Sequence, residues 1–301
     1  MRSRLVAALA AAGLLLGCQA KGQAPAPTPP ARLRLLAVGD IMMHADVKQA
    51  AAQAEDRDHG GLPSLWKDLV PDFRAADLVF GNLETPVAPE TGAPGRPFQF
   101  NAPAELPAAL KASGFVIVSV ANNHAFDQGH RGLLESLGRL ADAGLAPLGS
   151  GEDKEEAERP VILERNGIRI GFLGCADIFN ADLDGRIDRP WVRKLDIPEM
   201  AASVKALRAK VDAVVVSIHW GIEERHAPTK RQREAATALV AAGADLILGH
   251  HPHVIQPVEW ISSGGRKGLV AFSLGNFISN QNRVYQDGDA AKDGDERDEL
   301  M

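Results

Sequence analysis

Seven short runs rich in Val, Ile and Leu alternate along this chain with segments of helical pattern. The runs lack the apolar–polar alternation of a strand with one wet face, as is typical of strands buried on both faces. Such strands, separated by helices, predict an α/β fold in one domain, with several strands parallel. The runs occupy residues 35–38, 78–80, 115–120, 168–173, 214–218, 246–248 and 269–274.

Four segments between these runs have the spacing and the end signals of helices. Asn101, followed by Pro103, predicts the start of the first helix, because Asn caps helix amino ends and Pro suits the first turn. Gly144 and Gly243 predict the ends of two others. The predicted helices are residues 104–112, 131–143, 197–210 and 230–242.

The composition is that of an ordinary globular protein, with 301 residues of which 45% are hydrophobic and 24% are charged. The formal net charge is -6, and the sequence has no basic stripe. A protein that neutralises the phosphates of a nucleic acid needs such a stripe. We therefore expect no nucleic-acid partner.

The first residues predict a targeting segment. Arg2 and Arg4 precede an apolar run at residues 5–16, which is too short to span a bilayer and resembles the core of a signal peptide. The run is followed by Gly17-Cys18, which resembles a bacterial lipobox. In the lipoprotein interpretation residues 1–17 are removed and Cys18 is lipidated. In the alternative interpretation the signal is an ordinary secretory one and the cysteine is incidental.

Both interpretations place the protein outside the cytoplasm, in the periplasm or at the cell surface, and lipidation would anchor it to a membrane. Residues 18–31 contain four prolines and no large apolar residue, which predicts an extended tether. Residues 32–301 then form the domain, and Leu300-Met301 leave open that a further strand follows. The second cysteine, Cys175, lies in an apolar run and is predicted to be a buried thiol.

Polar residues follow five of the runs at the point where each run ends. Open α/β sheets bind ligands at the carboxyl ends of their strands, so we expect these side chains to meet at one edge. Asp, Glu, Asn and His together offer oxygen and nitrogen ligands for one or two divalent transition-metal ions, such as Mn, Fe or Zn. The residues are Asp40 with His44, Glu84, Asn123 with His124, His219, and His250, His251 and His253.

Each residue alone also has a simpler explanation. Asp40 would cap the segment that follows it, and Glu84 would lie in a surface turn. Asn123 would bond to its own loop backbone, as Asn often does, and His219 would be a satisfied core histidine. His44 would face water. The coincidence of five such strand ends favours a shared site, because burying these groups unpaired costs free energy.

In their order along the chain, these segments resemble the CapA-type poly-γ-glutamate capsule biosynthesis family. The resemblance covers residues 33–280, and that family in turn resembles the calcineurin-like metallophosphoesterases. It implies a four-layer α-β-β-α sandwich of the metallophosphoesterase type around a two-metal site. The segments that carry it are Gly39-Asp40 and residues 81–86, 121–129, 217–221, 249–256 and 272–277.

The resemblance implies a role for each matching residue at the metal site. Asp40 is the ligand from the first strand, and Glu84 stands where the superfamily usually has the aspartate that bridges two metals. The full set of ligands that it implies is Asp40, Glu84, Asn123, His219, His251 and His253.

The resemblance also implies a proton donor. His124 would protonate the leaving oxygen, and Asp127 would orient its ring and raise its pKa. In the superfamily a histidine stands two residues after the first aspartate, and here that position is Met42. Either His44 takes its place or one metal loses a ligand. His250 is an added neighbour, either a metal ligand or a support of one.

The function that the resemblance implies is that of a lipid-anchored, metal-dependent hydrolase of capsule or poly-γ-glutamate biosynthesis. Its substrate would be a phosphoester or the γ-glutamyl amide of an anionic polymer, and its partners the membrane and a capsule synthase complex. Two alternatives stay open. One is a non-catalytic component that tethers or exports polymer at such a complex, which Met42 favours. The other is a periplasmic phosphoesterase with another substrate.

Overall fold

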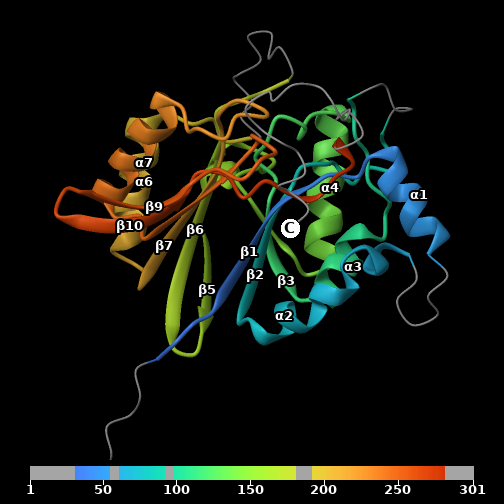
Figure 1. Ribbon diagram of the computed structural model, residues 1–301, viewed down its shortest axis with the longest axis horizontal. Helices are drawn as coiled ribbons and strands as arrows, with labels where there is room; N and C mark the ends of the chain where they lie inside the picture. The colour runs from blue at the N-terminus through green and yellow to red at the C-terminus, as the bar shows by residue number, and fades with distance from the viewer. Residues whose placement is uncertain (1–30, 55–60, 93–97, 181–191, 282–301) are drawn as a thin grey trace, which may run out of the picture. The chain divides into compact units, whose positions relative to one another are not determined.

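Two β-sheets lie face to face in the middle of the protein (Figure 1), in a computed structural model that describes residues 31–54, 61–92, 98–180 and 192–281. The first sheet has the strand order β11-β1-β2-β3-β4, and all of its neighbouring strands are parallel. Its strands are β1 (Leu35–Ile41), β2 (Leu78–Leu83), β3 (Phe115–Ser119), β4 (Ala146–Leu148) and β11 (Asn276–Ile278).

The second sheet has the order β5-β6-β7-β8-β10-β9. Its four inner strands are parallel, and each edge strand is antiparallel to its neighbour. Its strands are β5 (Val161–Arg165), β6 (Ile168–Ala176), β7 (Ala213–His219), β8 (Leu246–His250), β9 (Val258–Ser263) and β10 (Arg266–Ala271).

Helices cover the outer face of each sheet (Figure 1). Helices α1 (Ala45–Gln53), α2 (Val70–Ala75), α3 (Leu106–Ser113) and α4 (Gly129–Asp142) pack on the first sheet. Helices α6 (Ile197–Arg208) and α7 (Lys230–Ala242) pack on the second. The described part of the chain also contains α5 (Lys154–Glu158) and the short 3-10 helices η1 (Leu62–Leu65) and η2 (Lys67–Leu69).

Strand β7 shows why the apolar runs are continuous. Val214 and Val216 face the core beneath α6 and α7, whereas Val215 between them faces the core between the two sheets. Because successive side chains of a strand point to opposite faces, a strand covered on both faces must be apolar at every position. The core between the sheets also contains Phe80 and Phe172, both fully buried. The predicted four-layer α-β-β-α sandwich is therefore confirmed.

Each of the seven predicted strands is present, and each predicted helix has a counterpart; α7 has the predicted bounds, and the other three differ by a few residues at their ends. The missed strands are β4, β5, β9 and β11. Strands β4 and β11 have only three residues each. Strands β5 and β9 are sheet edges with exposed positions, so they carry no continuous apolar run. Helices α1, α2 and α5 were also missed.

The predicted cap of α3 is wrong. The helix begins after Glu105, with Pro107 in its first turn. Asn101 instead holds a neighbouring loop, because its side chain accepts a hydrogen bond from Ala88 N (2.9 Å) and donates one to Ala88 O (2.9 Å). An Asn near a helix start can serve either backbone, and the sequence does not distinguish the two.

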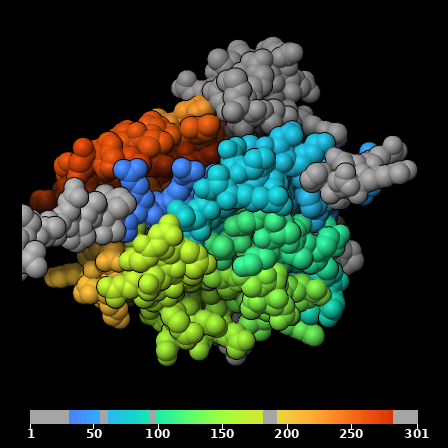
Figure 2. Space-filling view, turned by 90° about the horizontal axis from the view of Figure 1, so that it is seen from below, coloured from blue at the N-terminus to red at the C-terminus, as the bar shows by residue number. Residues whose placement is uncertain are grey.

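The amino ends of the parallel strands lie on the face seen in Figure 2, where the blue start of the described chain lies beside the yellow-green β5–β6 turn. Asn166 in that turn donates hydrogen bonds to Arg32 O (3.0 Å) and Asp77 Oδ1 (2.9 Å). Asp77 Oδ2 also accepts a hydrogen bond from Arg34 N (2.6 Å). These bonds connect the two sheets at the end opposite the carboxyl ends of the strands.

The proposed signal at residues 1–17, the lipidation site Cys18 and residues 19–30 of the tether lie outside the described residues, as does the tail at 282–301. Within the described ranges, no helix combines the length and the apolar character needed to cross a membrane. Cys175 is a buried free thiol in β6, as predicted.

Candidate metal centre

The polar residues predicted from the sequence lie together where the strands of both sheets end. Asp40 lies in β1, Glu84 follows β2, and Asn123 and His124 follow β3. His219 ends β7, and the segment with the three neighbouring histidines begins at the end of β8. Each of the predicted ligands is at most 5% exposed: Asp40, Glu84, Asn123, His219, His251 and His253.

Two glycines let the backbone approach closely next to the site. A Cβ atom at Gly39, directly before Asp40, would collide with the carbonyl oxygen of Gly275. A Cβ atom at Gly249, directly before His250, would collide with the carbonyl oxygen of Phe272. Only glycine fits where two backbones meet so closely. The glycine before each cluster therefore sets the position of the polar residues that follow it.

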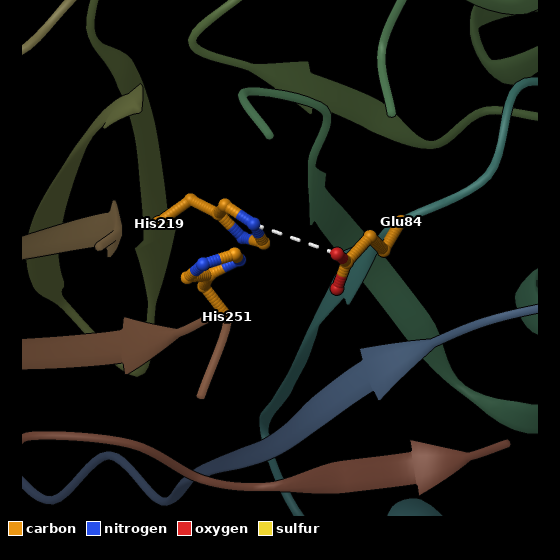
Figure 3. A group of neighbouring side chains, drawn as sticks. All are labelled: Glu84, His219 and His251. Atoms are coloured by element: carbon orange, nitrogen blue, oxygen red, sulfur yellow. Dashed lines mark ion pairs between the residues drawn. The ribbon is translucent and has the colours of Figure 1, made fainter. Parts of the chain in front are cut away.

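The carboxylate of Glu84 lies at the centre of the site. Its Oε1 atom is 3.4 Å from His219 Nε2, 3.9 Å from His253 Nε2 and 4.0 Å from His124 Nε2. Figure 3 shows Glu84 on one side of the site, facing the rings of His219 and His251 on the other. One oxygen of a buried carboxylate is thus surrounded by imidazoles from both sheets.

Three groups of side chains in the described part of the chain could each hold a metal ion. Every residue of a group offers one ligand atom, and the atoms of a group lie within 4.8 Å of one another. The groups are Glu84 with His219 and His251, Asp40 with Glu84 and His253, and Glu223 with His251 and His253. Glu84 belongs to the first two groups, so its carboxylate stands between two candidate positions for an ion. Sequence reasoning missed Glu223, which follows β7 by four residues.

Asp40 is held by contacts from both sheets. Asn82 Nδ2 donates to Asp40 Oδ1 (2.7 Å), and His253 Nδ1 lies 3.2 Å from Asp40 Oδ2. His250 Nδ1 lies 3.4 Å from Asp40 Oδ1. His253 Nδ1 also contacts Asn276 Oδ1 at 3.0 Å. Position 250 therefore lies beside the first-strand carboxylate.

The buried atoms of the site include several without a hydrogen-bond partner: Glu84 Oε1, His251 Nδ1, both ring nitrogens of His250, His44 Nδ1 and Asn82 Oδ1. A buried polar atom left unpaired costs about 1–3 kcal/mol. Carboxylate oxygens and imidazole nitrogens are ligand atoms for Mn, Fe and Zn. The residues present therefore fit a divalent metal ion.

The pKa values of the site separate its carboxylates. Burial, and then the charge of Asp40, raise the pKa of Glu84 well above its ordinary value. Burial alone would also raise the pKa of Asp40, but its contacts with His250 and His253 outweigh burial and hold that pKa well below its usual range. Without metal, Asp40 is therefore the ionised member of the pair.

The pKa values of the imidazoles separate in the same way. Burial lowers the pKa of His251 to about 4 and that of His219 well below its ordinary value. Burial acts on His253 too, but its interactions with Glu84 and Asp40 outweigh burial and raise its pKa to about 10. At neutral pH His219 and His251 are thus neutral, which is the form that binds metals.

The backbone of the histidine segment is strained. His251 has φ 96° and His253 has φ 60°, in the left-handed region that residues other than glycine rarely adopt. Such conformations cost roughly 1–3 kcal/mol each and concentrate at functional sites. The strain follows from placing two imidazoles of one short loop inside the same site.

His124 forms a separate unit at the edge of the cluster. Its Nδ1 atom donates to Asp127 Oδ2 (2.8 Å), and the same oxygen accepts a hydrogen bond from Phe100 N (2.7 Å). The ring of Phe100 packs against the His124 ring, with centroids 4.6 Å apart. The expected pairing of His124 with Asp127 is thus present. This pairing leaves His124 Nε2 facing Glu84, at 4.0 Å from Glu84 Oε1.

Two asparagines that sequence reasoning missed support the ligands. Asn82 Nδ2 lies 3.4 Å from His219 Nδ1, in addition to its bond to Asp40. Asn180, four residues beyond β6, accepts a hydrogen bond from Asn123 Nδ2 (3.0 Å). That bond turns Asn123 Oδ1 toward His219 Nε2, at 2.8 Å. The sequence could have pointed to Asn82, because it lies within the 81–86 motif. Asn180 lies in no such motif, so no signal in the sequence pointed to it.

Positions 42 and 44 differ in what they offer. Met42 is buried but belongs to none of the three core clusters. His44 is half-buried, and its ring packs edge-on against Phe100 at 4.7 Å. Burial, with the charges of His253 and His124, lowers the pKa of His44 to about 4. His44 belongs to none of the three ligand groups formed by the described residues.

The four-layer sandwich, with mixed carboxylate, amide and imidazole groups buried at its strand ends, has a fold of the metallophosphoesterase type. The NAD nucleotidase NadN of Haemophilus influenzae matches with a TM-score of 0.50 and 15% identity, over 79% of this chain and 49% of that chain. The calcineurin-like phosphoesterase YfkN of Bacillus subtilis gives a TM-score of 0.48 and 19% identity over 77% and 74%. At these identities the likeness concerns the fold alone.

The chain belongs to the family described as bacterial capsule synthesis protein PGA_cap, which matches residues 34–281. It is 34% identical to the PGA biosynthesis protein CapA of Bacillus subtilis, over 81% of this chain and 62% of that protein. It is 31% identical to the capsule biosynthesis protein CapA of Bacillus anthracis, over 83% and 60%. The match thus spans about three fifths of these relatives. The resemblance predicted from the motifs is confirmed.

Proposed function

We propose that this protein is a metal-dependent hydrolase of poly-γ-glutamate capsule biosynthesis. The observation that carries the proposal is the place of Glu84 in two ligand groups, one completed by His219 and His251 and the other by Asp40 and His253. A carboxylate shared in this way suits a pair of divalent ions. The names of the CapA relatives direct the proposal to capsule synthesis.

A pair of divalent ions held here would supply Lewis-acid activation of the substrate and of water. The protein's own groups do the rest. Asp40 and Glu84 supply negative charge, and Asn82 and Asn180 hold the carboxylate and the amide in place. His124 holds a proton at Nε2 for the leaving atom, while Asp127 accepts the Nδ1 hydrogen and fixes the ring.

The proposed substrate is the γ-glutamyl amide of the anionic polymer, with a phosphoester as the second choice. The chain carries a formal net charge of -6, so its overall charge repels a polyanion. Attraction must therefore be local, and bound cations at the strand ends would supply it. The same site chemistry serves an amide and a phosphoester, since both need a polarised centre and a protonated leaving group.

We further propose that lipid on Cys18 holds the protein outside the cytoplasm, at the membrane where a capsule synthase complex works. Support comes from the lipobox-like Leu15-Leu16-Gly17-Cys18 and from the proline-rich residues that follow. Cys18→Ala should move the protein from the membrane fraction to the soluble fraction of a lysate and abolish labelling by a radioactive fatty acid. Unchanged membrane attachment and labelling of this variant would rule out lipidation at Cys18.

Metal content and turnover of the purified full-length chain test the enzymatic proposal. We expect two equivalents of Mn, Fe or Zn per chain, with cleavage of poly-γ-glutamate or of a generic phosphodiester that His251→Ala abolishes. An absence of bound metal after metal-replete purification would rule out the two-metal site.

A second candidate function is favoured by the buried Met42 in the first motif. With one ligand fewer, the protein would bind metal and polymer without cleaving it, and would tether polymer at the synthase. Stoichiometric metal and polymer binding, without turnover of either substrate class, would select this function over the hydrolase.

A further inference from the structure

We propose that Glu223, on the loop after β7, is a metal ligand beside His251 and His253, and that it supplies a donor in place of the one that Met42 does not offer. The inference rests on the metal centre of the proposed function, but it does not depend on catalysis. It adds a carboxylate donor to His251 and His253, the two imidazoles with which Glu223 forms a ligand group.

The first observation is the distance. One carboxylate oxygen of Glu223 and one ring nitrogen each of His251 and His253 lie within 4.8 Å of one another. The two imidazoles are buried, at 5% and 4% exposure, whereas Glu223 is exposed. His251 Nδ1 is buried without a hydrogen-bond partner. An exposed carboxylate that approaches two buried imidazoles from the solvent side is placed to close a metal site.

The second observation is that the loop carrying Glu223 is bound to the loop carrying the histidines. Gly221, with φ 99°, allows the sharp turn after β7. Three hydrogen bonds then join residues 224–226 to residues 252–256. They run from Glu224 N to Pro252 O (2.8 Å), from Gln256 Nε2 to Arg225 O (2.6 Å) and from His226 Nδ1 to Ile255 O (2.9 Å). The backbone on both sides of the site is therefore fixed, so that the approach of Glu223 is part of the fold.

The third observation is the chemistry of the donors. The thioether of Met42 suits soft ions and is a poor ligand for Mn or Fe. His251 and His253 each also belong to one of the two groups that contain Glu84, and Glu223 adds an oxygen donor beside both imidazoles. His44, the other candidate for the missing donor, belongs to no ligand group among the residues that the structure describes. The carboxylate of Glu223 therefore fits this role better than the imidazole of His44.

The test compares Glu223→Gln with Glu224→Gln. Glu224 is the matched control, because it is also exposed and lies in the same hydrogen-bonded loop. Both variants remove one negative charge and keep the shape of the side chain. Each full-length protein is titrated with Co²⁺, followed by visible absorption and by calorimetry. We expect Glu223→Gln to weaken one of the two Co²⁺ equivalents at least 10-fold and to change the absorption spectrum. Glu224→Gln should stay within twofold of the wild type.

Wild-type affinity and spectrum for both equivalents in Glu223→Gln would overturn the inference, while leaving the two-metal centre intact. Failure of the wild type itself to bind Co²⁺ would overturn the metal centre and this inference together. His44→Ala serves as the competing variant. Loss of one equivalent in His44→Ala, with none in Glu223→Gln, would assign the missing donor to His44 and contradict our proposal.

Discussion

The two sheets contribute different chemistry to the same site. The strand ends of the first sheet bring mainly oxygen donors: Asp40, Asn82, Glu84 and Asn123. Those of the second sheet bring mainly nitrogen donors: His219, His250, His251 and His253. Both ligand groups that contain Glu84 take members from each sheet. The difference teaches that the centre exists only when the sheets are packed, so metal binding and sandwich stability are coupled.

Glu84→Gln should have the largest effect, because it removes the oxygen donor that both groups share. We expect the affinity for both ions to fall by more than the roughly 10–100-fold that loss of a supporting residue costs. Without metal the variant should melt about 2–4 °C higher, since it removes a buried carboxylate beside Asp40. Metal analysis and thermal melting in chelator measure the two effects.

The control for this variant is Glu234→Gln on the exposed face of α7, where Glu234 pairs only loosely with Lys230 (3.6 Å). It should change neither metal content nor melting temperature measurably. Retention of both ions by Glu84→Gln would contradict the inference that the two ions share the carboxylate of Glu84.

His124 follows β3 of the first sheet, and we expect it to move protons and not to bind metal. His124→Ala should keep its metal and lose about 10²–10⁴-fold in turnover of substrates with poor leaving groups. Turnover of a substrate that releases p-nitrophenolate should fall much less, because that leaving group needs no proton. Loss of a metal equivalent would instead make His124 a ligand, and so extend nitrogen donation to the first sheet.

A variant in the core between the sheets tests whether packing of the sheets and metal binding are coupled. Phe172→Ala should cost about 3–5 kcal/mol of unfolding free energy, because the ring is fully buried between the sheets. Denaturant titration with and without metal should show that bound metal restores part of that loss. Ile162→Ala, on the exposed edge strand β5, should cost less than about 0.5 kcal/mol and is the control.

The strained histidine segment allows a matched pair of variants. His251→Ala and His251→Gly both remove the imidazole, but only glycine adopts φ 96° without strain. His251→Gly should therefore be the more stable variant in chelator, by about 1 kcal/mol, with equal metal loss. Equal stability of the two in thermal melts would show that the backbone relaxes when the ring is removed.

The smallest effect concerns Cys175, which lies in β6 of the second sheet and outside the metal centre. Burial raises the pKa of its thiol to about 12, so the thiol stays protonated in the folded protein at pH 8. A disulfide reagent should react with it only after denaturation, and chelation of metal should not change this. Rapid reaction in native buffer would show that β6 opens locally.

The sequence predicted the inner strands because burial on both faces leaves a continuous apolar run, as in β7. It also predicted which polar residues lie together, because parallel strands bring their carboxyl ends to one edge. It could not predict β5 and β9, whose exposed positions look like loop sequence. Asn180 and Glu223 lie four residues beyond their strands, and only the packed loops bring them to the site.

The sequence also did not show which groups each of the three neighbouring histidines contacts. His250, His251 and His253 are neighbours in the chain, but their environments differ. His250 lies beside Asp40, His251 beside His219, and His253 between both carboxylates. A left-handed backbone at two of the three positions causes this divergence, and no local pattern in the sequence announces it.

Anomalous X-ray diffraction from crystals of the protein soaked in Mn²⁺ tests the central claim most directly. Our account predicts two anomalous peaks, one on each side of the Glu84 carboxylate, each with ligands from both sheets. A single peak bound by the imidazoles of the second sheet alone, or the absence of any peak at Glu84, would contradict it.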